Sequence, residues 1–509
     1  MIQRIIDWVK KYKYILLIFL LATSFFIIQH IFVLSWDFIS YTLNARHIFD
    51  NGIYFETFRP PLTSFIIGLI AQISGYPASE IIYIVLVNIL FCISVVLLSK
   101  RINFNSEIFY LILLTPLVLF YGLLNGTELL SITLLMFGIY FILKNNWVSG
   151  LFIGLSALTR YSGIAFGLFL LFHKGIKNKI KSIILFCITF VPWLIYNRIE
   201  LGNFFTSVAD QYFQNIVSRI GVGQTPQLLH FIYIQSILFL FTIFGLIFVI
   251  YKCIQSIRKS VPEINVRLSI IMLLLSVFTI FAYFTTPFKD LRYLFPMMLP
   301  IAYFTYIGII FVLSKINNNK QRNLFSIKLD FRRLYWILII LLLISSVIIL
   351  IINYNVDGNL KEKYTDAITI INTKSLQECV MYSDNWIFFN YLDKNIVLLP
   401  IEIYPLHIDA YTQKVLFLDL NNYNLNTLNL LQNKFPTIYK NNQFIILGNI
   451  NDCKKKADYP ILFYSIFKKG VINNPEVHIY TEPCNILFNS SRFITNMCNY
   501  FNYDLFPKK

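Results

Sequence analysis

Charged residues are scarce in this chain, and acidic residues are the scarcer kind. Asp, Glu, Lys and Arg make up 14% of the 509 residues, with 26 acidic residues against 43 basic ones, while hydrophobic residues make up 57%. Apolar stretches of about twenty residues, long enough to span a bilayer, recur along the sequence. The composition therefore excludes an ordinary soluble protein and indicates a polytopic α-helical membrane protein.

Several short signatures of common chemistries are missing. The sequence has no HExxH, no CxxC pair, no P-loop and no GxGxxG, so the usual zinc, thiol and nucleotide motifs give no lead. It also has no Asp-x-Asp pair near an apolar segment. Enzymes that use nucleotide sugars usually hold the diphosphate through a metal bound by paired acids. The absence of such a pair favours a donor with a single phosphate.

Cysteine is also rare, and its seven residues divide between two regions. Three lie in or beside apolar segments. The other four lie in the C-terminal tail, namely Cys379, Cys453, Cys484 and Cys498. In an external tail these four could form two disulfides, with a connectivity that the sequence does not reveal, or they could stay as free thiols.

The net charge of +17 is gathered in short basic segments between apolar runs. Lys and Arg cluster before the first run and in segments 174–181, 252–267 and 314–333, whereas residues 354–509 carry 15 basic and 14 acidic residues. This is the positive-inside pattern of membrane proteins. It predicts a multi-pass protein of the cell membrane with a cytoplasmic N-terminus, and it predicts membrane lipids rather than nucleic acid as partners.

The apolar runs predict about 10–13 transmembrane or broken helices within residues 1–353. No small-residue cleavage site follows the first run, so we expect it to be retained. An external loop over 36–60 follows, and a polar external loop is expected over 198–230. Segment 148–172 leaves the basic side and returns to it, which predicts two short helices joined near Arg160.

From about Tyr354 the composition changes, and polar residues become common. The short runs CVMYS, NIVLLP, KVLFLDL and QFIILG resemble strands separated by turns. Residues 354–509 are therefore predicted to form an external α/β or α+β domain. Residues 1–353 are predicted to form the transmembrane domain.

One acidic residue stands at the end of the first apolar run, in the pair Trp36-Asp37. Asp37 could mark the membrane boundary, with Trp36 as an interfacial anchor. Alternatively, it is a carboxylate at the mouth of a membrane cavity, where it would accept a proton from an acceptor hydroxyl as a general base.

Arg59-Pro60-Pro61 closes the same external segment. The two prolines keep the Arg out of a regular helix, and a guanidinium offers paired donors that match phosphate oxygens. Arg59 is thus a candidate phosphate ligand, or its side chain reaches lipid headgroups. Glu56 is a candidate for the acceptor site or its support. With His47 and Asp50 it gives only weak evidence for a divalent metal.

Arg160 and Glu128 are charged residues within or at the edge of predicted membrane spans. Arg160 is in the middle of an apolar segment, and such a group usually faces a cavity or a charged partner. Glu128 opens a predicted span, where an acid also suits the start of a helix. The two could form a structural ion pair, or both could serve a polar site.

The charged connection Lys289-Asp290-Leu291-Arg292-Tyr293 joins two apolar runs. Arg292 and Tyr293 would put a cation and a phenol at the external end of a helix, and Lys289 is a further candidate for the acceptor site. A solvated turn is the alternative interpretation.

The order of these short motifs resembles the C-type glycosyltransferase superfamily of polytopic membrane enzymes. Within it, the chain looks like the branch of protein O-mannosyltransferases and bacterial aminoarabinose transferases. The resemblance covers about residues 10–310 and, more loosely, the tail. It is carried by Trp36-Asp37, Arg59-Pro60-Pro61-Leu62, Glu128-Leu129-Leu130, Leu158-Thr159-Arg160 and Arg292-Tyr293-Leu294-Phe295-Pro296.

The resemblance implies transfer of a sugar from a polyprenyl phosphate, such as dolichyl or undecaprenyl phosphate, on the external face and usually with inversion. It makes Asp37 the base or the acid that positions the acceptor, and it makes Arg59, Arg160 and Arg292 the ligands of the lipid phosphate. The acceptor would be a hydroxyl of a lipid, glycan or protein. The sequence departs from the family where Phe38 follows Asp37 and Phe58 precedes Arg59, since relatives carry acids at these places.

Two other functions compete with transfer. Polytopic topology and a buried Arg also suit a transporter or flippase for an anionic glycolipid, but no internal repeat of two halves is visible. A catalytically inactive relative is the third hypothesis. The presence of Asp37 together with three candidate phosphate ligands argues against it.

Overall fold

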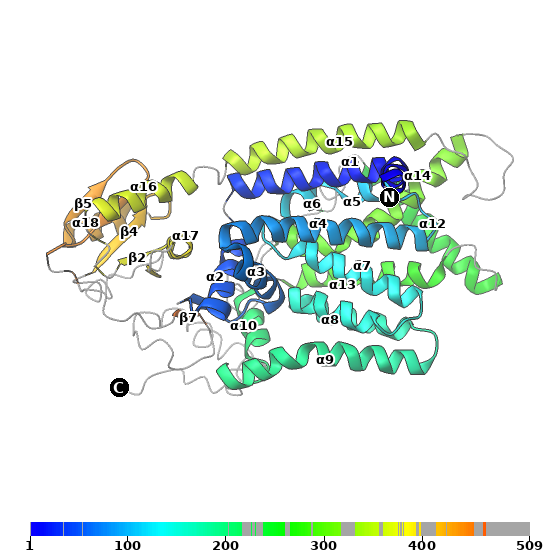
Figure 1. Cartoon of the computed structure of the whole chain (residues 1–509), viewed down its shortest axis with the longest axis horizontal. Coiled ribbons are helices and arrows are strands. Elements are labelled where there is room, and N and C mark those ends of the chain that lie inside the picture. The colour runs from blue at the N-terminus through cyan, green and yellow to red at the C-terminus, as the bar shows by residue number, and fades with distance from the viewer. Residues whose placement is uncertain are drawn as a thin grey trace.

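The computed structural model describes residues 2–464 with gaps, the longest at 216–237 (apart from 225 and 230), 260–264, 317–330, 399–413 and 454–461. Its helices form a bundle of roughly aligned rods, and a small mixed α/β domain lies beyond one end of the bundle (Figure 1). The N-terminus is at the opposite end. The predicted fold class is therefore confirmed.

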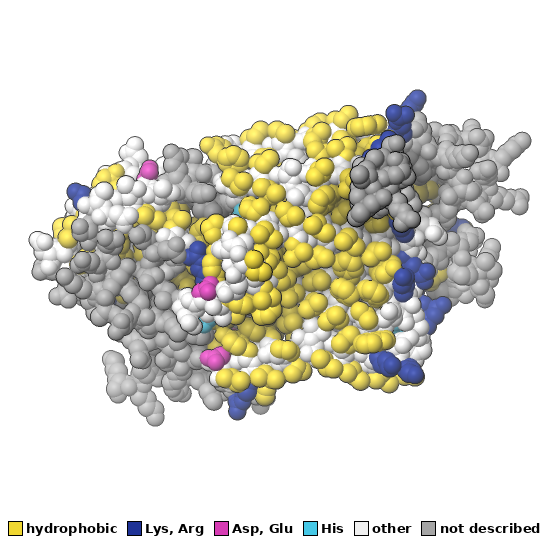
Figure 2. Space-filling model, in the orientation of Figure 1, with side chains coloured by type: hydrophobic (Ala, Val, Ile, Leu, Met, Phe, Trp, Pro, Cys, Tyr) yellow, Lys and Arg dark blue, Asp and Glu magenta, His cyan; other side chains and the backbone are white. Residues whose placement is uncertain are grey.

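Seven helices of the described residues are long and apolar enough to cross a membrane. Figure 2 shows hydrophobic side chains across the face of the bundle in view, with described Lys and Arg side chains gathered at the end remote from the C-terminal domain. The helices are α1 (Ile2–Phe32), α4 (Tyr76–Arg101), α9 (Ile176–Leu201), α12 (Phe239–Lys259), α13 (Val266–Thr285), α14 (Met298–Ile316) together with η4 (Leu291–Met297), and α15 (Phe331–Asn353).

Shorter helices fill the spaces between the long ones. Segment 148–172 forms α8 (Ser149–Thr159) and the 3-10 helix η1 (Tyr161–Phe172), joined at an extended Arg160, as predicted. Helix α7 (Glu128–Leu143) packs against α4 and α8.

Residues 107–124 form an apolar run long enough for one crossing, but they are divided into α5 (Ser106–Leu113) and α6 (Pro116–Tyr121). Pro116 has no backbone N–H to continue the first helix, and the Thr115 hydroxyl accepts a hydrogen bond from the Val118 N–H. A fresh N-cap therefore starts a second helix.

The segment 36–60 is mostly regular structure. It contains α2 (Trp36–Asp50) and the short strand β1 (Tyr54–Glu56). Helices α3 (Pro61–Ser74) and α10 (Thr206–Asn215) lie at the same end of the bundle (Figure 1). This end also faces the C-terminal domain.

The C-terminal domain contains a five-stranded sheet in the order β3-β2-β4-β6-β5, with parallel pairing in the first three strands and antiparallel pairing in the rest. Each of the four predicted runs contains a strand. The strands are β2 (Met381–Ser383), β3 (Val397–Leu398), β4 (Val415–Asp419), β5 (Thr437–Lys440) and β6 (Phe444–Leu447), and the helices are α16 (Leu360–Thr373), α17 (Trp386–Tyr391) and α18 (Leu425–Lys434).

Cys379 and Cys453 form a disulfide, with their Cα atoms 5.5 Å apart. This bond joins the chain before β2 to the chain after β6, and it is one of the pairings that the sequence left open. Cys484 and Cys498 lie outside the described residues.

Helix α2 is shared between the two parts of the molecule. Its residues Ile39 and Leu43 belong to the same buried cluster as Trp386 and Phe388 of α17. Trp36 makes edge-on contacts with both of these rings, at centroid distances of 6.1 and 5.8 Å. The strand β1 also pairs in parallel with β7 (Leu462–Tyr464). The C-terminal domain therefore contacts the helix that carries Asp37.

Candidate active site

Asp37 lies between two guanidinium groups. It is in the first turn of α2, where the helix dipole favours a negative charge. Its Oδ1 lies 3.0 Å from Nη1 of Arg59, and its Oδ2 accepts a hydrogen bond of 2.6 Å from Nη1 of Arg292. The Asp37 side chain is 24% exposed. One carboxylate thus joins Arg59 to Arg292, and Arg292 lies 255 positions after Asp37 in the sequence.

Arg59 is buried and held from several sides. Its Nε donates to the Glu56 carboxylate, and its guanidinium lies over the ring of Tyr41 at 5.1 Å from the centroid. The Asn44 side chain of α2 donates to the Glu56 carbonyl at 2.9 Å and accepts from the Glu56 N–H at 2.8 Å. Pro60 follows as the N-cap of α3. The guanidinium therefore has a defined position at the outer end of the bundle.

Arg292 comes from η4, whose N-cap is Asp290. The Asp290 side chain accepts from the Arg292 backbone N–H at 3.0 Å and also lies 3.2 Å from Nε of Arg292. The guanidinium lies 5.6 Å from the centroid of the Tyr293 ring. The Tyr293 hydroxyl is buried and has no hydrogen-bond partner among the described residues. A phenol of this kind can donate to a bound ligand.

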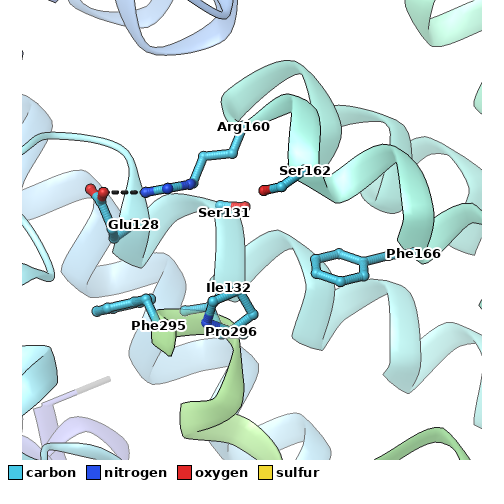
Figure 3. A pocket seen from close by; sticks show the side chains of 8 residues that line it. All are labelled: Glu128, Ser131, Ile132, Arg160, Ser162, Phe166, Phe295 and Pro296. Carbon is cyan, nitrogen blue, oxygen red and sulfur yellow. Dashed lines mark hydrogen bonds and ion pairs between the residues drawn. The ribbon is translucent and has the colours of Figure 1, made fainter. Parts of the chain in front are cut away.

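Arg160 and Glu128 form an ion pair, which agrees with the structural alternative that the sequence left open. Glu128 also accepts from the Thr127 hydroxyl at 3.1 Å. The pair lines a small pocket together with side chains of α7, η1 and η4 (Figure 3). The other lining residues are Ser131, Ile132, Ser162, Phe166, Phe295 and Pro296.

Two residues that the sequence analysis did not select complete this region. Tyr41 lies one helical turn after Asp37 on α2, and burial raises its pKa to about 12, with Asp37 and Glu128 raising it further and Arg59 and Arg160 lowering it. The charges of the Asp37–Arg59 pair and of the Glu128–Arg160 pair therefore both affect the Tyr41 hydroxyl. A polar residue at i+4 from Asp37 was the available signal.

Gly126 is the other missed residue. Its φ is +84°, and a Cβ at this position would lie 3.0 Å from the ring of Phe38, next to Asp37. Its carbonyl accepts a hydrogen bond from the Tyr83 hydroxyl. Only a glycine suits both the left-handed backbone and the close approach of Phe38.

The site contains more acidic than basic side chains, so it is not a simple cationic pocket. The three guanidiniums of Arg59, Arg160 and Arg292 are paired with carboxylates, and the acids number four: Asp37, Glu56, Glu128 and Asp290. An arginine has five N–H donors, and among the described residues these ion pairs leave the second terminal nitrogen of Arg59 and of Arg292 without a carboxylate partner. An incoming anion would share or replace a carboxylate.

These arginines also act on Asp37 itself. Partial burial raises the pKa of the Asp37 carboxyl, but the charges and hydrogen bonds of Arg59 and Arg292 outweigh burial and hold the pKa well below its usual range. Asp37 is therefore an anion throughout the physiological range, and it takes up a proton poorly while both guanidiniums contact it.

The other sequence-selected residues lie in different surroundings. Lys289 caps the C-terminal end of α13. Its Nζ donates to the carbonyls of Tyr283 and Phe284 at 2.9 Å each and to that of Thr286. His47 contacts the Gly52 carbonyl at 2.6 Å, and Asp50 accepts from Tyr76 and Gln72. His47 and Asp50 are thus not gathered with Glu56. Among the described residues, no group of three His, Cys, Asp or Glu side chains could hold a metal.

The architecture is that of a polytopic membrane protein, with a helical bundle, a charged cluster at one end and an α/β domain beyond that end. Residues 58–284 match the model of glycosyltransferase family 87. A comparison with curated protein sequences gives no match.

Two solved structures share the fold across nearly the whole chain. ArnT from Cupriavidus metallidurans bound to undecaprenyl phosphate is similar with a TM-score of 0.58 and 12% identity, covering 87% of this chain and 100% of ArnT. The apo state of the same ArnT gives 0.56 and 11%, covering 89% and 100%. The family match over residues 58–284 and the shared fold agree with the resemblance to the C-type membrane glycosyltransferases.

Proposed function

We propose that this protein transfers a sugar from a polyprenyl phosphate to an acceptor hydroxyl on the external face of the membrane, with inversion at the anomeric carbon. The observation that carries the proposal is Asp37, which contacts Arg59 and Arg292 at one end of the helical bundle. One carboxylate and two guanidiniums are the groups that such a transfer needs: a base for the acceptor and donors for the leaving phosphate.

The donor's phosphate would bind at the guanidiniums. The unused terminal nitrogens of Arg59 and Arg292 and the unpartnered Tyr293 hydroxyl provide hydrogen-bond donors. Arg160 is a second candidate ligand at the pocket of Figure 3. The solved ArnT structure with undecaprenyl phosphate supports a lipid phosphate as the ligand of this fold.

Donor binding would also prepare the base. A phosphate that takes over hydrogen bonds of Arg59 and Arg292 offsets their effect on Asp37, so the pKa of Asp37 rises toward its usual range. The acceptor oxygen then forms its bond to the anomeric carbon while the bond from that carbon to the phosphate oxygen breaks. The acceptor proton passes to Asp37, and the arginines stabilise the charge on the departing lipid phosphate.

The orientation of the chain follows from charge. The described Lys and Arg side chains gather at the end of the bundle remote from the C-terminal domain (Figure 2), and by the positive-inside rule this supports a cytoplasmic location for that end. In this orientation, the N-terminus is cytoplasmic, and Asp37 and the C-terminal domain are external. The external acceptor is then a hydroxyl of a lipid, a glycan or a protein.

The test is transfer from radiolabelled polyprenyl-phosphate sugars to a cell-envelope extract by purified full-length protein. Asp37→Asn should lower transfer by about 10²–10⁴-fold, which is the usual contribution of a general base. Asp50→Asn is the matched control, since it removes a carboxylate from the exposed end of the same helix, and it should keep wild-type transfer.

Each other outcome has a definite meaning. Equal transfer by wild type and Asp37→Asn would remove Asp37 as the base. If folded wild-type protein binds the lipid phosphate but transfers no sugar from any donor, the transferase proposal fails and a transporter becomes the better hypothesis.

A further inference from the structure

Helix α10 carries two fully buried polar side chains on one face. Ser207 and Asp210 lie three residues apart, which places them on the same side of a helix. The sequence analysis treated this stretch only as a polar loop. Burying a carboxylate costs free energy unless a hydrogen-bond partner replaces the lost water. The partner of Asp210 therefore indicates what this residue does.

Asp210 accepts a hydrogen bond from the Thr57 hydroxyl. Thr57 is itself fully buried and stands two residues before Arg59. The neighbouring Glu56 backbone is held by Asn44 of α2. The short stretch that presents Arg59 is therefore held by α2 on one side and by α10 on the other.

Ser207 makes the equivalent contact with the second arginine segment. Its Oγ accepts from the Tyr161 hydroxyl at 3.1 Å and from the Trp193 indole N–H at 3.0 Å. The same indole N–H donates to Tyr161 at 2.6 Å. Tyr161 directly follows Arg160, at the extended break between α8 and η1. Helix α10 thus contacts the neighbours of both Arg59 and Arg160.

We propose that α10 positions the lipid-phosphate site, with Asp210 setting the place of Arg59 through Thr57 and Ser207 setting the place of Arg160 through Tyr161. This inference rests on the proposed function, because it takes the two arginines as ligands of the donor's phosphate. Asp210 and Ser207 are positioning residues and do not contact the donor.

Two readouts separate positioning from a general loss of folding. The first is hydrogen exchange of the full-length, ligand-free protein, measured for the peptide that contains residues 54–59. Asp210→Ala should increase exchange there and leave α4 and the C-terminal sheet unchanged. Asp210→Asn should behave nearly as wild type, because its amide oxygen can still accept from Thr57. Asp366→Asn, on the exposed face of α16, is the matched control.

The second readout is the affinity for undecaprenyl phosphate, measured by equilibrium binding in detergent. Asp210→Ala should weaken binding about tenfold, the effect of losing one hydrogen bond to a charged group. Thr57→Val should weaken it similarly, and the double variant should lose no more than either single one. In an Arg59→Ala background, Asp210→Ala should have no further effect, because it acts through Arg59.

The outcomes separate this inference from the proposed function. Wild-type affinity in Asp210→Ala, or an unchanged exchange rate at 54–59, overturns the positioning role. An additive loss in the Arg59→Ala background overturns the route through Arg59. If wild-type protein binds no polyprenyl phosphate, the lipid-phosphate site itself is refuted, while the exchange experiment still decides whether Asp210 holds the 54–59 segment.

Discussion

Two clusters of buried charge are built on different plans. At the outer end of the bundle, carboxylates and guanidiniums from distant parts of the sequence meet around Asp37, which is 24% exposed. In the C-terminal domain, Lys363 of α16 pairs with Asp419 at the end of β4, and both side chains are under a tenth exposed. The first cluster is open to a ligand, and the second is enclosed.

In the second cluster, the carboxylate oxygens are all hydrogen-bonded to groups of the same domain. Asp419 accepts from Lys363, from the Asn385 side chain at 3.3 Å and from the Asn421 N–H at 3.1 Å. Asp384 accepts from Asn422 at 2.6 Å and from Ser383 at 3.4 Å. Every carboxylate oxygen of this pair thus has a donor within the domain. In contrast, the first cluster leaves guanidinium nitrogens and a tyrosine hydroxyl for a ligand. Changes to the second cluster should affect stability, and changes to the first should affect function.

The largest expected effect is on stability, from Lys363→Met. Removing one partner of a buried ion pair leaves Asp419 charged and uncompensated, which typically costs about 3–5 kcal/mol. Hydrogen exchange of β4 in the full-length protein should report this loss. Lys374→Met, at the exposed end of α16, should leave exchange unchanged. Similar exchange in both variants would contradict the structural role of the pair.

Arg292→Lys, in the first cluster, should have a large effect on activity and a small effect on stability. A lysine ammonium cannot bridge Asp37 and Asp290 as the planar guanidinium does. The specificity constant kcat/KM should fall about 10²-fold, as for loss of one transition-state donor. Arg332→Lys, on the exposed start of α15, is the control. Unchanged kcat/KM in Arg292→Lys would show that its bridging geometry is not used.

The pH dependence of stability should also divide the two clusters. Burial, helped by the charge of Asp419 and opposed by the hydrogen bond from Asn422, raises the pKa of Asp384 from 3.8 to about 6. The folded domain then binds a proton more tightly than the unfolded chain, so its stability is highest at low pH and declines between about pH 4 and 6. Asp384→Asn should remove this decline and stabilise the domain at pH 7 by roughly 3 kcal/mol. Unfolding curves at pH 5 and 7 measure both effects, and a parallel decline in the variant would assign the dependence to another group.

The smallest effect is expected at Gly126, close to the first cluster. Gly126→Ala and Gly75→Ala both place a Cβ on a left-handed backbone, with φ of +84° and +74°, but only the former also meets Phe38. Each should cost about 1 kcal/mol through backbone strain. Transfer activity should fall further in Gly126→Ala, because Phe38 is next to Asp37. Equal activities, measured at matched protein stability, would show that Phe38 does not transmit the change.

The sequence predicted much of the local structure because its signals are local. Apolar runs of sufficient length indicated the spans, and the polar break at Arg160 indicated two short helices. Short apolar runs separated by turns indicated four of the strands. The break at Thr115-Pro116 was missed because the flanking residues are apolar on both sides. Helix α2 was missed because its polar residues contact neighbours from several elements, so the segment has no clean apolar face.

The sequence alone determined the membrane class and the choice of Asp37, Arg59, Arg160 and Arg292 as candidate site residues, and it predicted a domain division near residue 354. Hydropathy and charge act within about one helix length, so they are readable along the chain. Only the tertiary structure decided that Asp37 joins Arg59 to Arg292, that Glu128 pairs with Arg160, and that Asp210 contacts Thr57. These contacts depend on how helices far apart in sequence pack together, and no local pattern records that packing.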